Sequence, residues 1–248
     1  MSKHRKYWEE FYADMRSGGH RSSEEEFLLM EANEKLYHLV GGKTLLDFGC
    51  GASELLVHYA PKYEKLVGVD FSESMLDEAS KRISEKKCEN VSLILANDIT
   101  VWEKLEFSFD RITAAGVIQH LTYHEIDMFI FNASRYLNEG GKIVLFDIVD
   151  SRLNPLWKMG LLSQNPKPLK ILRKVGYELK TMLSASLKNR PIDILGYSYS
   201  PYSIEKIVNK YGFKMTYVHS MYYEYKFHAI IFRTKCSDIV EASELNLP

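Results

Sequence analysis

Two glycines and an acid stand at the ends of two successive apolar runs, where they could bind a nucleoside. Gly49 and Gly51 follow the first run, and Asp70 closes the second run. In doubly wound α/β folds, glycines after the first strand let the backbone approach a ligand closely, and an acid about 20 residues later binds ribose hydroxyls. The spacing therefore predicts a ligand that contains a nucleoside.

The charges around these glycines indicate which nucleoside is bound. A dinucleotide site carries a third glycine beside the pyrophosphate, but this chain has Glu54 at that position. A carboxylate is a poor neighbour for a pyrophosphate at a helix N-terminus. Asp47 places a second acid just before Gly49. Two acids around the loop favour a ligand with positive charge and no phosphate. S-adenosylmethionine, with its adenosine, sulfonium and ammonium groups, fits this description.

One histidine stands where a general base would be needed. His120 follows the fourth apolar run, and ligands of open α/β sheets bind at the carboxyl ends of the strands. Its unperturbed pKa of about 6.5 suits proton abstraction near neutral pH. The alternative is that His120 hydrogen-bonds the backbone or packs against the cofactor.

Alternating apolar runs and helical patterns would position these residues. The near-continuous apolar character of several runs suits strands that are covered on both faces. An antiparallel pair is expected to close the chain. The predicted fold is α/β, with a doubly wound, mostly parallel seven-stranded sheet. Its strands are expected at 43–48, 65–70, 91–96, 109–116, 141–149, 214–223 and 225–233.

Helix boundaries are marked by capping residues. Thr122 and Glu125 form a capping box for a helix at about 123–137. Ser200 before Pro201 marks the start of another helix. These signals place helices between the predicted strands, as a doubly wound fold requires.

Five segments between about residues 40 and 150 resemble, in the family's order, the motifs of class I S-adenosylmethionine-dependent methyltransferases. The first, Asp47-Phe48-Gly49-Cys50-Gly51-Ala52-Ser53, resembles the glycine loop of that family. Ser53 departs from it, since the family often has a glycine there, and a modest backbone adjustment is expected. The other segments are 69–76, 97–99, 109–112 with 116–121, and 137–142.

The resemblance implies a role for each residue of the cofactor site. Asp47 would reach the ammonium group, and Asp70 would accept from both ribose hydroxyls. The product would be S-adenosylhomocysteine. The remaining residues would line the methionine end and the adenine: Gly49, Gly51, Ala115 and Gly116 for the former, and Phe71, Asp98 and Ile99 for the latter.

Four parts are expected along the chain. Residues 1–40 would form an N-terminal helical cover, 41–150 the cofactor-binding core, 151–200 an inserted helical lid, and 201–248 the end of the core. Between residues 151 and 190 there are nine basic residues and one acid, Glu178. This segment is interpreted as a lid over an anionic substrate, a patch that touches anionic lipid, or a solvated helical face. The N-terminal helix has a similar alternative, in which it simply packs on the domain.

Composition excludes several classes of protein. With 248 residues and 46% hydrophobic content, the chain can bury one sizeable core. The net charge of −1 does not favour nucleic acid. The three cysteines show no metal or redox spacing, and no apolar run approaches the roughly 18 residues of a membrane span. A cytoplasmic protein without metal, DNA or transmembrane segment is expected.

The expected activity is methyl transfer to an oxygen or nitrogen of a small molecule, which could be anionic or lipid-like. Tyr12, Tyr199 and Tyr202 are the tyrosines expected to contact this acceptor. Three alternatives stay open: an RNA or protein methyltransferase, a non-catalytic subunit that binds S-adenosylmethionine, and a nicotinamide dehydrogenase, which Glu54 disfavours.

Overall fold

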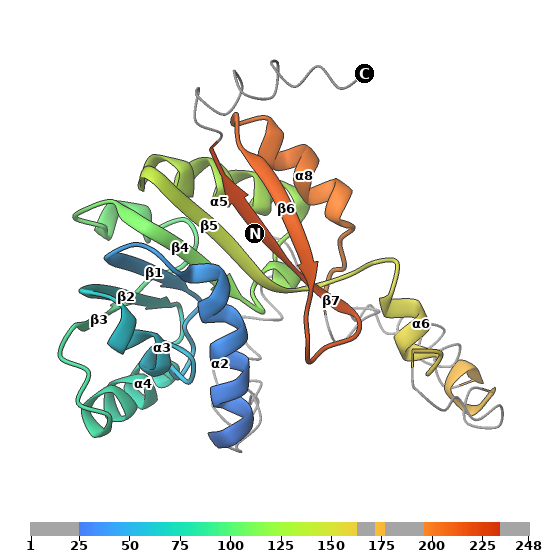
Figure 1. Ribbon diagram of the computed structural model, residues 1–248, viewed down its shortest axis with the longest axis horizontal. Coiled ribbons are helices and arrows are strands. Elements are labelled where there is room, and N and C mark those ends of the chain that lie inside the picture. The colour runs from blue at the N-terminus through green and yellow to red at the C-terminus, as the bar shows by residue number, and fades with distance from the viewer. Residues whose placement is uncertain (1–24, 163–171, 177–195, 234–248) are drawn as a thin grey trace, which may run out of the picture.

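A seven-stranded sheet forms the centre of the protein (Figure 1). The computed structural model describes residues 25–162, 172–176 and 196–233. The strand order is β3-β2-β1-β4-β5-β7-β6, in which β1 to β5 are parallel and β7 is antiparallel to both of its neighbours. This confirms the predicted doubly wound, mostly parallel sheet. The strands are β1 Thr44–Phe48, β2 Lys65–Asp70, β3 Val91–Leu95, β4 Phe109–Ala115, β5 Leu137–Val149, β6 Lys214–His219 and β7 Lys226–Phe232.

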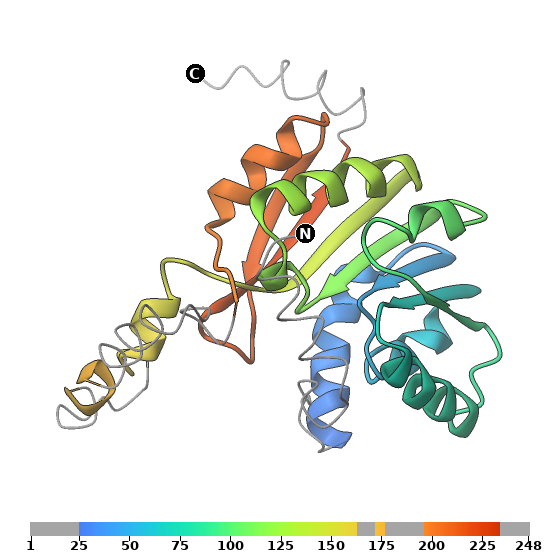
Figure 2. The same cartoon turned by 180° about the vertical axis from the view of Figure 1, so that it is seen from behind.

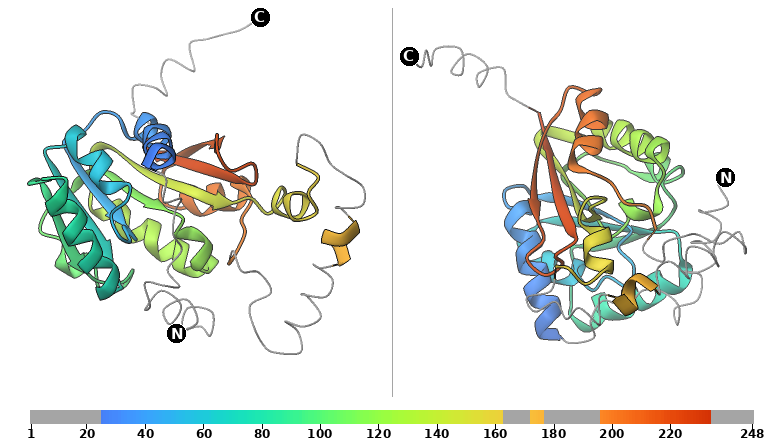
Figure 3. Two further views of the ribbon diagram at one scale, coloured as in Figure 1. Left: turned by 90° about the horizontal axis from the view of Figure 1, so that it is seen from below. Right: turned by 90° about the vertical axis from the view of Figure 1, so that its right-hand side faces the viewer.

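Helices cover both faces of this sheet. Figure 3 shows α2 on one side of the strands and α5 and α8 on the other, and Figure 2 shows α5 and α8 side by side. α3 lies beside α2, and α4 packs against β2 and β3. The helices are α2 Glu25–Leu39, α3 Leu56–Tyr59, α4 Glu73–Glu85, α5 Tyr123–Arg135, α6 Asn154–Lys158 and α8 Pro201–Asn209.

The predicted caps are confirmed. The Thr122 hydroxyl accepts from the backbone N–H of Glu125, whose carboxylate accepts in return from the Thr122 N–H at 2.7 Å. Ser200 caps α8 by accepting from the Ser203 N–H, and Pro201 occupies the first turn, where its missing N–H costs nothing. Such caps stabilise a helix by about 1 kcal/mol each. They fix where α5 and α8 begin, close to the carboxyl ends of β4 and β5.

Two apolar cores lie on the two faces of the sheet. One contains Trp102 and Phe129 and is covered by α5 and α8. The other contains Leu45 and Phe146 and is covered by α2 and α3. Burying such side chains contributes about 1.5–3 kcal/mol each. These cores hold the carboxyl ends of the strands in a fixed arrangement.

Helix α2 meets the sheet through buried charges, which the sequence did not predict. The Lys35 ammonium is fully buried, 3.1 Å from a Glu31 carboxylate oxygen and 3.1 Å from an Asp147 carboxylate oxygen. Asp147 has a φ of +60° at an irregularity in the pairing of β5 with β7. Bulges of this kind redirect a side chain, and here the redirected carboxylate pairs with the helix.

A second polar contact joins α2 to the β6–β7 hairpin. A Glu34 carboxylate oxygen accepts from the backbone N–H of Met221 at 2.6 Å and lies 3.1 Å from His228 Nε2. His228 Nδ1 accepts from the backbone N–H of Asp147. Because Nδ1 accepts, the proton of a neutral His228 imidazole lies on Nε2, facing Glu34.

Some predicted boundaries differ from the structure. Strand β5 begins at Leu137, since Leu137 pairs with Phe109 ahead of an irregularity in the register, so part of the turn expected at 137–142 belongs to the strand. Strand β6 ends at His219, so residues 220–223, which were expected to continue the strand, belong to the connection before β7. The predicted helix at 123–137 ends two residues early, at Arg135.

The two segments expected to cover the site are described only in part. Helix α6 projects beyond the carboxyl end of β5 (Figure 1), inside the predicted lid at 151–200. Most of that segment, and residues 1–24 of the predicted N-terminal cover, lie outside the described residues. Within the part that the structure describes, no helix has the length and apolarity needed to cross a membrane.

Candidate active site

The candidate site lies where the strand order reverses, between β1 and β4. From β1 the chain proceeds to β2 and β3 on one side, and then returns to β4 on the other. Open α/β sheets bind ligands outside the carboxyl ends of the strands at such a switch point. The two loops that leave β1 and β4 touch there, because a Cβ on Gly49 would overlap a methyl group of Val117. Glycine is therefore required at this contact.

The loop after β1 is a tight turn anchored on β2. The backbone N–H groups of Gly49 and Cys50 both donate to the carbonyl of Val69, at 2.7 and 2.9 Å. Gly51 has a φ of +54°, and a Cβ built on it would meet no atom of the described residues within 4 Å. Among these residues, the side of the loop at Gly51 is therefore open to a ligand.

Ser53 adopts a left-handed backbone conformation of the kind that favours glycine. Its φ is +58°, in the left-handed region, and its side chain is fully buried. A non-glycine residue in this region costs about 1–2 kcal/mol. The loop thus keeps a glycine-like path at Ser53 at some cost in stability.

Asp70 is a buried carboxylate that accepts hydrogen bonds from backbone amides. One oxygen accepts from the Gly51 N–H and the other from the Ser72 N–H, both at 2.9 Å. The Phe71 amide also lowers the pKa of Asp70. Because a carboxylate has about four acceptor positions, Asp70 keeps acceptor capacity beyond these amides. Burial raises the pKa of Asp70 above its usual 3.8, against the lowering effect of these amides. A ligand that donated two hydroxyls would complete the site and stabilise the charged form.

Asp47 supplies a second buried acid next to the loop. It lies in β1 between Gly68 of β2 and Thr113 of β4 and is 4% exposed. Burial, and then the charges of Asp47 and Asp70, raise the pKa of the Cys50 thiol well above its usual value. Cys50 is therefore held as a protonated thiol and is unsuited to act as a nucleophile.

Glu54 has a partner that the sequence did not reveal. Arg82 of α4 donates to the Ala52 carbonyl at 2.7 Å and lies 3.8 Å from a Glu54 carboxylate oxygen. Arg82 therefore offsets part of the negative charge that Glu54 would present to a pyrophosphate. The buried acids Asp47 and Asp70 carry the remaining preference for a cationic ligand.

Apolar side chains are exposed beside the ends of β2 and β3. Phe71 is 40% exposed and Ile99 is 68% exposed. Asn97 folds this turn, since its side-chain oxygen accepts from the N–H groups of Ile99 and Thr100 at 3.0 Å. The same turn presents Asp98, which is partly exposed. An acid and exposed apolar groups on these two neighbouring loops are suited to a flat heterocycle that carries an amino group.

The segment after β4 carries the candidate base. Ala115 ends the strand, and Gly116 follows with a φ of +70° and donates its N–H to the Phe146 carbonyl at 3.1 Å. His120 ends the short 3₁₀ helix Ile118–His120 and is partly buried. Its Nε2 lies 3.4 Å from Nε2 of Gln119. The imidazole therefore stands one short turn beyond the carboxyl end of β4.

The three predicted acceptor tyrosines have different positions. Tyr199 is 1% exposed, and its hydroxyl donates to the carbonyl of Leu121. The structure thus gives Tyr199 a different environment from the one expected of an acceptor contact. Tyr202 lies on α8 and is 69% exposed, and Tyr12 is outside the described residues.

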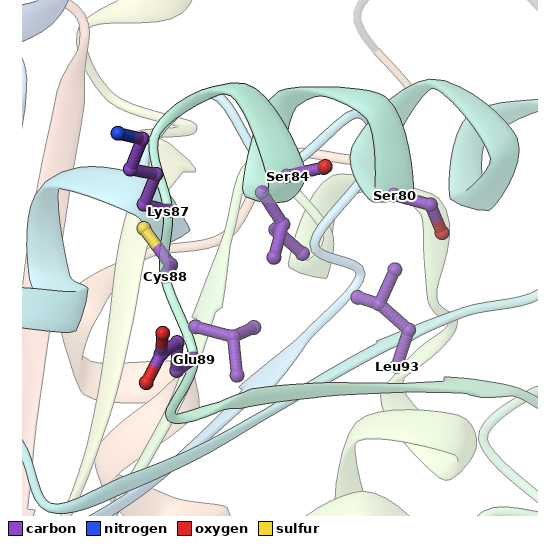
Figure 4. A pocket seen from close by; sticks show the side chains of 8 residues that line it. Ser80, Ser84, Lys87, Cys88, Glu89 and Leu93 are labelled. Carbon is purple, nitrogen blue, oxygen red and sulfur yellow. The ribbon is translucent and has the colours of Figure 1, made fainter.

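A hollow of about 480 Å³ lies away from these residues, between α4 and β3 (Figure 4). Its lining comes from the C-terminal half of the helix, the following turn and the edge strand. None of the predicted site residues contributes to it. The lining residues are Ser80, Ile83, Ser84, Lys87, Cys88, Glu89, Val91 and Leu93. In the described part of the chain, no group of three or more His, Cys, Asp or Glu side chains could hold a metal ion.

Comparison with known families and proteins agrees with this geometry. Residues 45–141 match the family model described as a methyltransferase domain. Pavine N-methyltransferase from Thalictrum flavum subsp. glaucum is 30% identical over 120 residues, which is 48% of this chain and 33% of that protein. Cyclopropane mycolic acid synthase 3 from Mycobacterium tuberculosis is 26% identical over 189 residues, 76% of this chain and 60% of that protein. The chain thus spans between a third and three fifths of these relatives.

Solved structures share the fold over nearly the whole chain. Magnesium protoporphyrin IX methyltransferase from Synechocystis PCC 6803, with bound S-adenosylmethionine, has a TM-score of 0.60 at 13% identity and covers 94% of this chain and 99% of its own. N-methyltransferase NodS from Bradyrhizobium japonicum WM9, with bound S-adenosylhomocysteine, has a TM-score of 0.59 at 14% identity, with the same coverage. At such identities the likeness shows the fold.

Proposed function

Because residues 45–141 belong to the methyltransferase-domain family and the chain has the class I S-adenosylmethionine-dependent methyltransferase fold, we propose that the protein transfers a methyl group from S-adenosylmethionine to a small molecule. The accepting atom is an oxygen or a nitrogen. The product of the cofactor is S-adenosylhomocysteine.

The observation that carries this proposal is the geometry of Asp70. Its two oxygens accept from the backbone amides of Gly51 and Ser72. The Phe71 amide also lowers its pKa, and a carboxylate with about four acceptor positions keeps capacity for the donors of a ligand. Two adjacent hydroxyls of a ribose match this need. The raised pKa of the buried carboxyl also fits, since donated hydroxyls would offset the cost of its burial.

Neighbouring residues fit the other parts of the cofactor. The open side of Gly51 leaves room for the methionine portion, and the buried charge of Asp47 suits its ammonium group. Phe71 and Ile99 would lie against the adenine, where Asp98 would accept from the amino group. Ala115 and Gly116 would offer backbone at the methionine end, as Gly49 does from the other loop.

The protein's own contribution is to position and orient the reactants. S-adenosylmethionine, when bound, supplies a methyl group that its sulfonium already activates. Holding the acceptor in line with that methyl group can contribute about 7–11 kcal/mol. His120, just beyond the end of β4, would accept the proton of an acceptor that must lose one, and such a base contributes about 10²–10⁴-fold.

A small-molecule acceptor is supported by the relatives rather than by a described pocket. The matches include plant N-methyltransferases whose names specify pavine and tetrahydroprotoberberine. We propose that residues 151–200, where the basic side chains gather, form a lid that determines which acceptor binds. The same charges would also suit an anionic acceptor or an anionic lipid surface.

The test has two steps. Calorimetric titration with S-adenosylmethionine, S-adenosylhomocysteine and NAD should give heat for the first two compounds only. The protein is then incubated with methyl-tritiated S-adenosylmethionine and separate small-molecule, RNA and protein fractions of a cell extract. Label in the small-molecule fraction supports the proposal. Label only in RNA or protein, or heat from NAD alone, would overturn it.

A further inference from the structure

The turn that carries His120 is held from outside by a segment almost 80 residues further along the chain. Within the turn, the N–H of His120 donates to the Val117 carbonyl and that of Leu121 to the Ile118 carbonyl. The carbonyls of Gln119 and Leu121, which flank His120, are used differently. Both accept hydrogen bonds from residues 197–199.

Two donors make this contact. The backbone N–H of Tyr197 donates to the Gln119 carbonyl at 2.7 Å, and the hydroxyl of Tyr199 donates to the Leu121 carbonyl. The carbonyls on the two sides of His120 are thereby fixed at once. A rotation of the turn would break at least one of these bonds.

Gly196 allows the segment to approach the turn that carries His120 closely. Its φ is +84°, and a Cβ at this position would overlap the Gln119 carbonyl oxygen. The same Cβ would lie 3.6 Å from Nδ1 of His120. The backbone of Gly196 therefore lies directly beside both the turn and the imidazole, in a place that no side chain could share.

The segment is itself fixed to the sheet. The N–H of Tyr199 donates to the Val149 carbonyl at 2.8 Å, and the Tyr199 carbonyl accepts from the Ser151 N–H at 3.1 Å. Tyr199 also forms a parallel bridge with Asp150. Its buried ring meets the Tyr123 ring edge-on, with centroids 4.9 Å apart. These contacts thus fix the position of the turn relative to the carboxyl end of β5.

We propose that the Gly196–Tyr199 segment is a positioning element, which fixes the His120 imidazole relative to the end of the sheet. Gly196 sets the approach, and Tyr199 locks the turn through its hydroxyl. Neither residue takes part in the reaction itself. Only the role of His120 as a base rests on the proposed function. The contacts position the imidazole whether or not it acts as a base.

The test compares Tyr199→Phe and Gly196→Ala with the matched control Tyr202→Phe, which removes an exposed hydroxyl close by in the chain. Tyr199→Phe keeps the buried ring and removes one hydrogen bond. Amide hydrogen exchange at residues 119–121 should then become about tenfold faster, as expected from the loss of one buried hydrogen bond. The ¹⁵N shifts of the His120 imidazole at fixed pH should move in both variants and stay in place in the control. The affinity for S-adenosylhomocysteine should not change.

Each outcome decides the proposal. Unchanged imidazole shifts and exchange in Tyr199→Phe would overturn it, and so would equal changes in Tyr202→Phe. If a variant fails to fold, the wild-type protein still decides, because a Tyr197 amide that exchanges freely would contradict the contact. An active His120→Ala enzyme would instead refute the base assignment and leave the positioning result standing.

Discussion

Replacing Asp70 by Asn tests the cofactor site with little change in shape. Asn has one acceptor oxygen, whereas both oxygens of Asp70 already accept a backbone amide. The variant therefore loses one hydroxyl partner outright and meets the other with a neutral group. A hydrogen bond to a charged group contributes about 1.5–3 kcal/mol and a neutral one about 1 kcal/mol. The expected loss is about 2–4 kcal/mol, or roughly 30- to 10³-fold in affinity.

The assay is calorimetric titration with S-adenosylhomocysteine. Asp77→Asn is the matched control, because Asp77 is an exposed acid on α4, whose N-terminus adjoins Asp70. The control should bind like the wild type. The thermal stability of Asp70→Asn should stay close to that of the wild type, because removing a charge whose burial raises its pKa offsets the lost amide contact. An Asp70→Asn protein that binds within about threefold of the wild type would refute the reasoning.

Four further outcomes are expected. In titrations at different pH values, the affinity for S-adenosylhomocysteine should fall as the pH drops toward the raised pKa of Asp70, since protonation removes an acceptor. This pH dependence should vanish in Asp70→Asn. An equal pH dependence in both proteins would exclude Asp70 from the binding site. His120→Ala should lower the methyl-transfer rate about 10²–10⁴-fold with cofactor affinity unchanged, whereas near-normal turnover would exclude a base. Lys35→Met should lower the free energy of unfolding, measured in urea, by about 3–5 kcal/mol, because it leaves two buried carboxylates without their cation. The exposed control Lys81→Met should lower it by under about 0.5 kcal/mol. Equal losses in the two variants would show that burial of the Lys35 ion pairs does not matter for stability. Ser53→Gly should raise the unfolding free energy by about 1 kcal/mol through relief of its left-handed backbone, and a loss of stability would show that the serine itself is needed.

The sheet could be predicted because its signals are local. Apolar runs, glycines and caps such as the Thr122–Glu125 box act within a few residues, and the structure keeps each of them. The acid closing β2 is also set locally, since Asp70 ends a buried strand. Short right-handed crossovers between parallel strands then limit the strand orders that are possible.

Helix α2 shows why the rest was not predictable. Leu29 and Tyr37 are 47% and 75% exposed, whereas Glu31 and Lys35 of the same helix are fully buried. Hydrophobic periodicity predicts the opposite, with the apolar residues buried and the charged residues exposed. The reversal depends on Asp147, which a bulge in β5 turns toward the helix. Such a partner is distant in sequence and leaves no local signal.

Within the candidate site, the loops were predictable and their supports were not. Gly49, Gly51 and His120 follow strands that the sequence marks. The contacts that hold them come from elsewhere, such as Arg82 on the Ala52 carbonyl and Tyr199 on the Leu121 carbonyl. A single tyrosine gives no sign in the sequence of whether it faces a pocket or locks a turn.

The decisive measurement is a crystal structure of the protein grown with S-adenosylhomocysteine. We expect density for the adenosine outside the carboxyl ends of β1 and β2, with both ribose hydroxyls within hydrogen-bond distance of the Asp70 carboxylate. Density at another place, such as the hollow between α4 and β3, or none at a saturating concentration, would contradict it.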